Sequence, residues 1–301
     1  MRVHSDWSTS AFDLPPVAEA VGPFVRAPFL RAASDLTDGT VRLVEGDGGL
    51  WALTERSGRL EMAGDADLTD YHSPLGEDPG PVLTEYAQSL EAGLDIEFDS
   101  LPLGAAELAV KALDAGGIDA SLRQHEVAAV VELPDTFDAY LDAVGKKQRH
   151  EIRRKRRRYE DVVGAVVLER HDGAGWGFDE FVRLHRMADG EKGEFMTDRR
   201  LGFFESLASQ DGWVVDLLRH PESGAATACA FSFVGKEYWL YNSSYDPDLS
   251  DGSPGVALLG ALIERAIEDR CTRFDFLKGD EVYKFRMGAS ERPLYVVSGR
   301  R

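Results

Sequence analysis

Residues 272–288 read TRFDFLKGDEVYKFRMG, and this stretch decides the fold. Phe274, Phe276 and Leu277 predict a short buried strand, and Gly279 then lets the chain reverse direction at low conformational cost. A strand end that feeds a tight polar turn is where a scaffold typically presents binding or catalytic side chains. The polar side chains that follow this strand are Lys278, Asp280, Glu281, Tyr283, Lys284 and Arg286.

A loop of small residues and a helix precede that strand. Residues 247–255 read PDLSDGSPG, and residues 255–268 predict a helix. Such a loop can turn backbone N–H groups toward a ligand at a helix N-terminus, where hydrogen bonds and the helix dipole favour phosphate. The alternative is that the loop simply starts a helix, since Pro254 lacks a backbone donor. The residues in the phosphate-binding positions are Ser253, Gly255, Val256 and Ala257.

The whole chain predicts a mixed α/β protein with two similar halves, residues 1–134 and 135–301. Each half is expected to be a mixed, largely antiparallel sheet flanked by helices, with a cleft between the halves. In the first half we predict helices at 15–37, 80–92 and 104–114, and strands at 40–45, 50–55, 59–63, 94–98 and 125–133. In the second half we predict helices at 135–143, 145–160, 177–189, 198–209 and 255–268, and strands at 162–170, 212–219, 225–234, 237–244 and 273–277.

Charge is concentrated in one segment. The chain carries a net charge of −19, yet residues 146–158 (KKQRHEIRRKRRR) hold nine Lys or Arg and one Glu. Three interpretations are open: a solvated helix face, an element held by ion pairs to the acidic body, or a site for a polyanionic ligand. On a helix, Arg149, Arg153 and Arg157 share one line, and the first two are our candidate phosphate ligands.

Composition excludes several classes of protein. An apolar content of 43% with no long apolar run is typical of a soluble protein and predicts no membrane association. Two cysteines without a secretion signal favour free thiols in the cytoplasm. The seven histidines show no metal-ligand spacing, so no metal is expected. The sequence also lacks a Walker-type loop and a G-x-S-x-G motif.

Several motifs together resemble the FemAB-like (CelD-like) branch of the GNAT acyltransferase superfamily. The order small-residue loop, helix, buried strand and Tyr-Lys turn resembles its C-terminal half, although the loop lacks the usual R/Q-x-x-G-x-G/A pattern. The basic helix, the Phe181–His185 segment with its following glycines, and Asp70-Tyr71 resemble further family segments, so the likeness covers roughly residues 40–290. The resemblance implies two GNAT-like halves, of which only the second usually keeps an intact donor cleft.

The polar turn holds the candidate catalytic residues. Amine acylation requires the amine to lose a proton, an oxyanion to be stabilised and the leaving group to gain a proton. Asp275 could orient or deprotonate an amine, as could Glu281, and Tyr283 could protonate the leaving group. Lys284 could stabilise an oxyanion. Capping, ion pairing and ordinary packing are the structural alternatives. Candidate substrate-binding residues are Lys278, His185, Asp70 and Tyr71.

The expected function is transfer of an acyl group from an acyl-thioester, acyl-CoA, to an amine of a small molecule. Relatives of this branch also transfer aminoacyl groups from aminoacyl-tRNA, and residues 146–158 could hold such an RNA. A non-catalytic binding protein with a GNAT-like fold is the third hypothesis. The sequence names neither the acceptor nor the acyl group.

Overall fold

The chain folds into two compact units. The computed structural model describes residues 1–188 and 190–301. Unit 1 comprises residues 1–128 and 292–301, and unit 2 comprises residues 129–291. The C-terminal ten residues therefore belong to unit 1, whereas the sequence placed them with the second half. Two strands, β6 (Ala120–Glu132) and β12 (Ser290–Arg300), carry the chain from one unit to the other.

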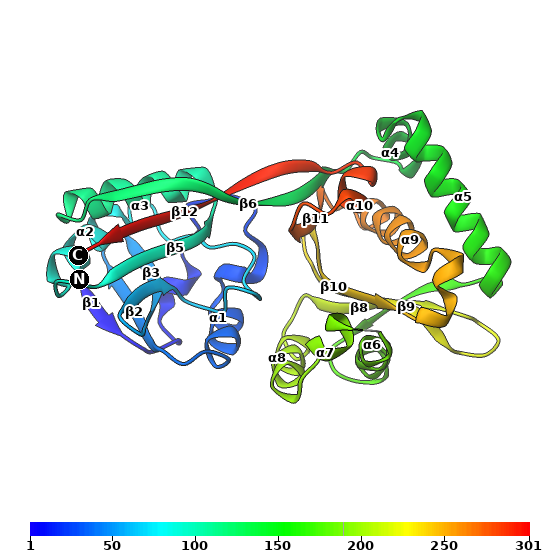
Figure 1. Cartoon of the computed structure of the whole chain (residues 1–301), viewed down its shortest axis with the longest axis horizontal. Coiled ribbons are helices and arrows are strands. Elements are labelled where there is room, and N and C mark those ends of the chain that lie inside the picture. The colour runs from blue at the N-terminus through cyan, green and yellow to red at the C-terminus, as the bar shows by residue number, and fades with distance from the viewer. Residues whose placement is uncertain (189) are drawn as a thin grey trace. The chain divides into compact units, whose positions relative to one another are not determined.

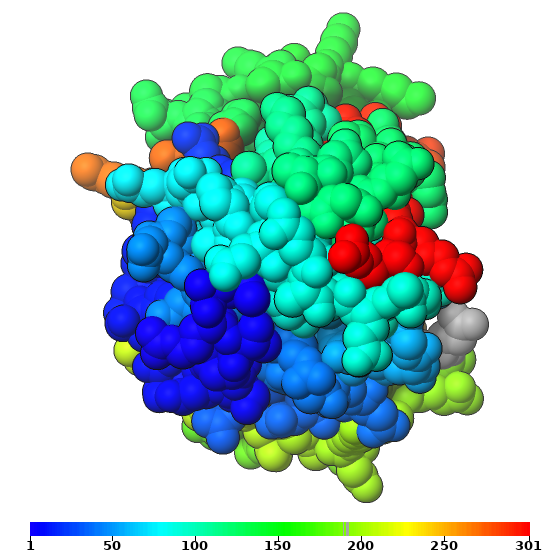
Figure 2. All heavy atoms as spheres, turned by 90° about the vertical axis from the view of Figure 1, so that its left-hand side faces the viewer, coloured from blue at the N-terminus to red at the C-terminus, as the bar shows by residue number. Residues whose placement is uncertain are grey.

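Unit 1 is built on a mostly antiparallel sheet. Strands β1 to β4 pair antiparallel in sequence order, β4 pairs parallel with β5, and β5 pairs antiparallel with β12. Figure 2 shows the C-terminal residues, in red, against the cyan residues of this unit. The elements are β1 Arg2–His4, α1 Ala27–Ser34, β2 Thr40–Gly46, β3 Gly49–Arg56, β4 Arg59–Met62, α2 Gly80–Ser89, β5 Asp95–Leu101 and α3 Leu103–Ala115.

The predicted helix over 15–37 is wrong in its extent. Only Ala27–Ser34 forms an α-helix, and short 3-10 helices occupy Ser10–Asp13 and Gly22–Val25. Prolines explain the difference, because each removes a backbone donor and tolerates only the first turn of a helix. Pro28 lies in that first turn of α1, while Pro15 and Pro16 lie outside any helix.

In unit 2 the strands, which belong to the same 12-stranded sheet as those of unit 1, have helices on both faces. Strands β7 to β10 pair antiparallel in sequence order, and β10 pairs parallel with β11. Helices α5 and α9 cover one face, and α6 to α8 cover the other (Figure 1). The elements are α4 Phe137–Ala143, α5 Gly145–Val163, β7 Val167–Asp172, α6 Trp176–Met187, α7 Glu191–Phe195, α8 Asp198–Ala208, β8 Trp213–Arg219, β9 Ala226–Val234, β10 Tyr238–Tyr245, α9 Pro254–Glu268, β11 Arg273–Lys278 and α10 Val282–Arg286.

The two units repeat one order of elements. In unit 1 a three-strand meander, β2 to β4, is followed by a helix and by β5, which pairs parallel with β4. In unit 2 the meander β8 to β10 is likewise followed by α9 and by β11, which pairs parallel with β10. The predicted fold class, two α/β halves with largely antiparallel sheets, is confirmed.

Further elements differ from the sequence prediction. The segment 282–286 forms a short helix instead of a turn, and α5 continues to Val163, where a strand was expected. Residues 290–300 form β12, for which no strand was predicted. The helix predicted at 177–189 forms as α6; residue 189 itself lies outside the described residues.

Apolar packing and one ion pair fix α5 on unit 2. Ile152 and Tyr159 are 2% and 1% exposed, and the Tyr159 hydroxyl contacts the Thr227 hydroxyl on β9. Each buried side chain of this size contributes about 1.5–3 kcal/mol. Arg156 adds an ion pair of 2.8 Å to Glu264 on α9. The basic helix is therefore a packed element of unit 2 with a defined orientation.

Candidate functional site

The parallel strands β10 and β11 pair over a short distance only. The pairing joins Tyr238 to Phe274 and Trp239 to Asp275 and then ends. Just beyond it, a bulge between Leu240 and Asn242 shifts the register of β10 against β9. Bulges re-aim side chains and often lie next to active sites, and carboxyl ends of neighbouring parallel strands are common ligand sites. Functional residues are therefore expected around these strand ends.

A pocket of about 340 Å³ lies where α5, the start of α9 and α10 meet. We call it the α5–α10 pocket. Three cations line it, Lys147, Lys155 and Arg286, together with one carboxylate, Glu151. Its remaining lining residues are Gln148, Ile152, Val256, Tyr283 and Met287. Charged walls around an apolar floor suit a ligand that has both anionic groups and an apolar part.

The charge balance of this pocket is positive. Glu151 lies 2.7 Å from Arg154 and 3.8 Å from Lys155, and the hydrogen bond from Arg154 lowers the pKa of its carboxyl. Lys147 and Arg286 make no ion pair to any residue of 1–188 or 190–301. The Lys147 ammonium is therefore available to an anionic ligand, and the Arg286 guanidinium, whose charge also lowers the pKa of Glu151, can be shared with one.

The first turn of α9 contributes to one wall of the pocket. Ser253 precedes the helix with a left-handed φ of 64°, and Pro254 supplies no N–H. The backbone N–H groups of Gly255 and Val256 have no partner within the helix because they lie in its first turn. Val256 lines the α5–α10 pocket, whereas Ala257 is buried, donates its N–H to the Ser253 carbonyl and lines a different cavity. Of the four predicted phosphate-binding residues, Val256 thus lines the α5–α10 pocket, and Ser253, Gly255 and Ala257 do not.

Lys284 is buried at the end of β11. Its side chain is only 3% exposed, and its ammonium lies 3.3 Å from the carbonyl oxygens of both Leu277 and Gly279. It also contacts the Lys278 carbonyl and lies 2.9 Å from the Glu281 carboxylate. These four acceptors occupy the ammonium, so the structure favours a role in holding the chain reversal over a role at an oxyanion.

Asp275 supports the same reversal. Its carboxylate accepts the Leu277 N–H at 2.7 Å, and Leu277 has a left-handed φ of 64°. A non-glycine residue in this region of backbone space is strained and is held by its surroundings. Asp275 is 2% exposed, which also favours the capping interpretation over contact with an amine. The Lys278 side chain is half-buried at the strand end.

Tyr283 is the predicted catalytic residue that faces the pocket. The residue keeps 42% of its surface exposed and packs edge-on against Phe276 at 6.3 Å. Even so, desolvation of the phenol, helped by the charge of Glu281, raises the pKa of Tyr283 to about 12. The hydroxyl therefore keeps its proton at neutral pH and can donate it, as protonation of a leaving group requires.

Arg149 and Arg153 point to α4, away from the pocket. Arg149 contacts Asp142, and Arg153 lies 3.4 Å from Asp138. The ion-pair interpretation of the basic helix therefore describes these two residues. The pocket is lined instead by Lys147 and Lys155, which lie on a neighbouring row of the same helix and were not predicted as ligands from the sequence.

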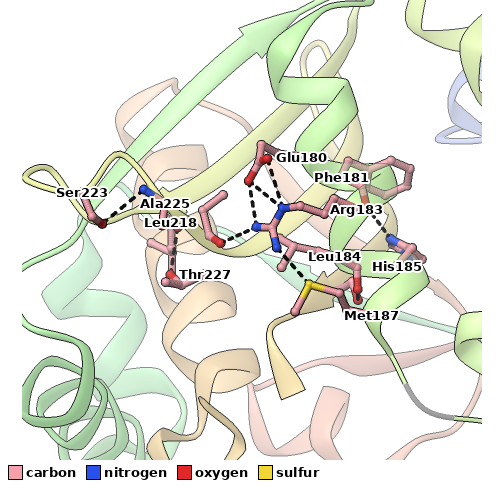
Figure 3. Close-up of polar contacts among 12 residues, drawn as sticks. Glu180, Phe181, Arg183, Leu184, His185, Met187, Leu218, Ser223, Ala225 and Thr227 are labelled. Atoms are coloured by element: carbon pink, nitrogen blue, oxygen red, sulfur yellow. Dashed lines mark hydrogen bonds and ion pairs between the residues drawn. The ribbon is translucent and has the colours of Figure 1, made fainter. Parts of the chain in front are cut away.

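The remaining candidates do not line the pocket. His185 on α6 has no exposed surface, and its ring nitrogens lie 3.1 Å from the Phe181 carbonyl and 2.8 Å from Asn242 Oδ1. Figure 3 shows it beside Arg183, which donates to Glu180 and to the Ala226 carbonyl.

Asp70 and Tyr71 belong to unit 1. Tyr71 has no exposed surface, and the Arg292 guanidinium lies 4.8 Å from its ring centre. Packing in the core of unit 1 therefore explains the position of Tyr71.

No helix among the described residues has the length and apolarity needed to cross a membrane. Residues 1–188 and 190–301 contain no cluster of metal-ligating side chains.

Comparisons with known proteins place this site in a family. Residues 146–285 match the family described as acetyltransferase (GNAT) domain. No curated protein sequence matches the chain.

Solved structures share the fold. FemX has a TM-score of 0.64 and 12% identity over 99% of this chain and 97% of that one. The C-terminal domain of a putative lysylphosphatidylglycerol synthetase from Agrobacterium fabrum has a TM-score of 0.59 and 15% identity, covering 90% of this chain and 86% of that one. L-PGS from Bacillus licheniformis has a TM-score of 0.56 and 15% identity, covering 90% and 87%.

Residues 146–285 thus match a GNAT domain, and the solved structures share the fold of most of the chain. The resemblance found in the sequence is confirmed. The α5–α10 pocket is lined by residues 147 to 287, so it lies almost entirely within the matched segment.

Proposed function

We propose that the protein transfers an acyl group from a thioester of coenzyme A to an amine of a small molecule. The observation that carries this proposal is the α5–α10 pocket, where three cations and the first turn of α9 surround one cavity beside the Tyr283 hydroxyl. Phosphate groups fit such a place, because free N–H groups and the helix dipole act together with Lys and Arg side chains.

Each residue of the pocket then has one task. Lys147, Lys155 and Arg286 hold the phosphates of the donor, and the apolar floor of Ile152, Val256 and Met287 receives the less polar part. The amine attacks the thioester carbon, and the sulfur leaves with the proton that Tyr283 donates. The proton that the amine loses then returns to the Tyr283 phenolate, either through solvent or through the acceptor.

Titration calorimetry with coenzyme A tests the proposal. The double variant Lys147→Gln/Arg286→Gln removes two cations from the pocket, and we expect binding to weaken by at least about tenfold with a smaller dependence on salt. The matched control is Arg149→Gln/Arg153→Gln, which removes two cations of the same helix that pair with α4. Equal weakening by both variants, or no binding by the wild type, contradicts the proposed donor site.

A second candidate function is aminoacyl transfer from aminoacyl-tRNA. The observation that favours it is a set of exposed cations on α5 beyond the pocket, Lys146, Arg157 and Arg158, which pair with no residue of the described chain. A nucleic acid needs such an extended surface, whereas a small donor does not. Binding of charged tRNA without binding of coenzyme A favours this candidate. Binding of neither favours a non-catalytic protein.

A further inference from the structure

Asn242 is the only asparagine among the 301 residues, and it lies directly after the β10 bulge. The parallel pairing of β10 with β11 ends three residues earlier, at Trp239. Its side chain reaches α6, on the sheet face opposite α9. The residue therefore lies where the two strands part and where the bulge redirects side chains.

Two contacts fix the orientation of the Asn242 carboxamide. One atom of it accepts the Ser243 backbone N–H at 2.8 Å, and a backbone N–H can only donate. That atom is therefore Oδ1, and His185 Nε2, at 2.8 Å from it, must be the donor. The His185 ring is itself held in place, since it is fully buried and its centre lies 4.4 Å from that of the Phe181 ring.

The amide nitrogen is left without a partner by this arrangement. Asn242 is half-buried, and its Nδ2 makes no hydrogen bond within residues 1–188 and 190–301. The buried His185 thus fixes the direction of the two Nδ2–H groups of Asn242, and these can donate hydrogen bonds to a ligand. Preorganised donors of this kind stabilise negative charge that develops in a transition state.

We propose that Asn242 donates an Nδ2–H hydrogen bond to the carbonyl oxygen of the acyl group and that His185 positions it. This inference rests on the proposed acyl transfer. Donor phosphates in the α5–α10 pocket lie on the α9 face, so the thioester would lie where β10 and β11 part, with Tyr283 on the α9 side of it and Asn242 on the other.

The reaction proceeds in two balanced steps. The amine nitrogen bonds to the thioester carbon, and the π electrons of the carbonyl move to its oxygen, which Asn242 binds. The carbonyl then re-forms, the carbon–sulfur bond breaks, and the sulfur takes one proton while the amine loses one. The products are an amide and the free thiol, and no oxidant or reductant takes part.

The test measures thiol release from acetyl-coenzyme A with hydroxylamine as the amine, after subtraction of the reaction without protein. Asn242→Asp keeps an oxygen toward Ser243 and His185 but removes both N–H donors. We expect kcat to fall by about 10²–10³-fold, while the Kd for coenzyme A changes less than about threefold. Gln88→Glu, an exposed amide-to-acid change in unit 1, is the matched control and keeps the wild-type kcat.

A second pair of variants separates positioning from folding. His185→Gln retains an N–H that can reach Asn242 Oδ1, whereas His185→Ala frees the carboxamide to rotate. We expect His185→Ala to lower kcat about 10-fold or more without raising the Kd for coenzyme A, and His185→Gln to restore most of it. Wild-type kcat in Asn242→Asp overturns the inference and leaves the proposed function standing. Absence of thiol release by the wild type overturns both.

Discussion

Replacement of Lys284 by methionine tests the structural role that burial assigns to this lysine. The change keeps most of the side-chain volume and removes the ammonium, which is 3% exposed and contacts three carbonyl oxygens and Glu281. A hydrogen bond to a charged group contributes about 1.5–3 kcal/mol, and a buried carbonyl left unpaired costs about 1–3 kcal/mol. Glu281 is exposed and can rehydrate, so its loss adds little. We expect unit 2 to lose roughly 3–4 kcal/mol.

Urea unfolding measures this loss. With a slope of about 2–3 kcal/mol per molar urea, the midpoint should fall by about 1–2 M, and the slope should stay unchanged. Lys236→Met, at an exposed lysine of the same unit, is the control and should stay within about 0.5 kcal/mol of the wild type. If Lys284→Met unfolds at the wild-type urea concentration but loses turnover about 10²-fold, Lys284 is a catalytic group and the burial argument is wrong.

Three further predictions concern unit 2. Asp216→Ala leaves Arg170, at 2.9 Å, and the Tyr238 hydroxyl, at 2.6 Å, without their buried carboxylate, so stability should drop by about 3–5 kcal/mol in urea unfolding. Burial, and then the charge of Asp269, raises the pKa of Cys271 to about 11; the folded thiol thus stays protonated above the unfolded pKa, and stability should fall as pH rises from about 9 to 11. Cys271→Ala should remove that part of the slope. Tyr283→Phe should lower turnover by about 10²-fold or more with little change in donor affinity, and turnover at wild-type level would exclude Tyr283 as the proton donor.

Most of the fold could be predicted from the sequence because the patterns that indicate its helices and strands are local. The meander at 212–244 alternates strands with turn residues, and the helix at 255–268 has an apolar face, so both formed close to the expected residues. Strand β12 escaped prediction because its pairing partner, β5, lies nearly 200 residues away in the chain. Periodicity alone cannot reveal such a partner.

The site was predictable only in part for the same reason. Tyr283 and Val256 were found because a loop, a helix start and a strand end mark them in the sequence. The direction of Arg149 depends on where α4 folds back, and the burial of Lys284 depends on three carbonyls of the preceding turn. The orientation of the Asn242 side-chain amide depends on the bulge and on His185, which lies 57 residues earlier in the chain. These contacts are set by tertiary packing.

A crystal structure with coenzyme A bound tests the central claim most directly. We expect the pyrophosphate in the α5–α10 pocket, within hydrogen-bond distance of the Val256 N–H and of at least two of Lys147, Lys155 and Arg286. The thiol end should lie beyond Trp239, where β10 and β11 cease to pair. Coenzyme A bound outside this pocket, or along Arg149 and Arg153 with their α4 ion pairs broken, would contradict the account.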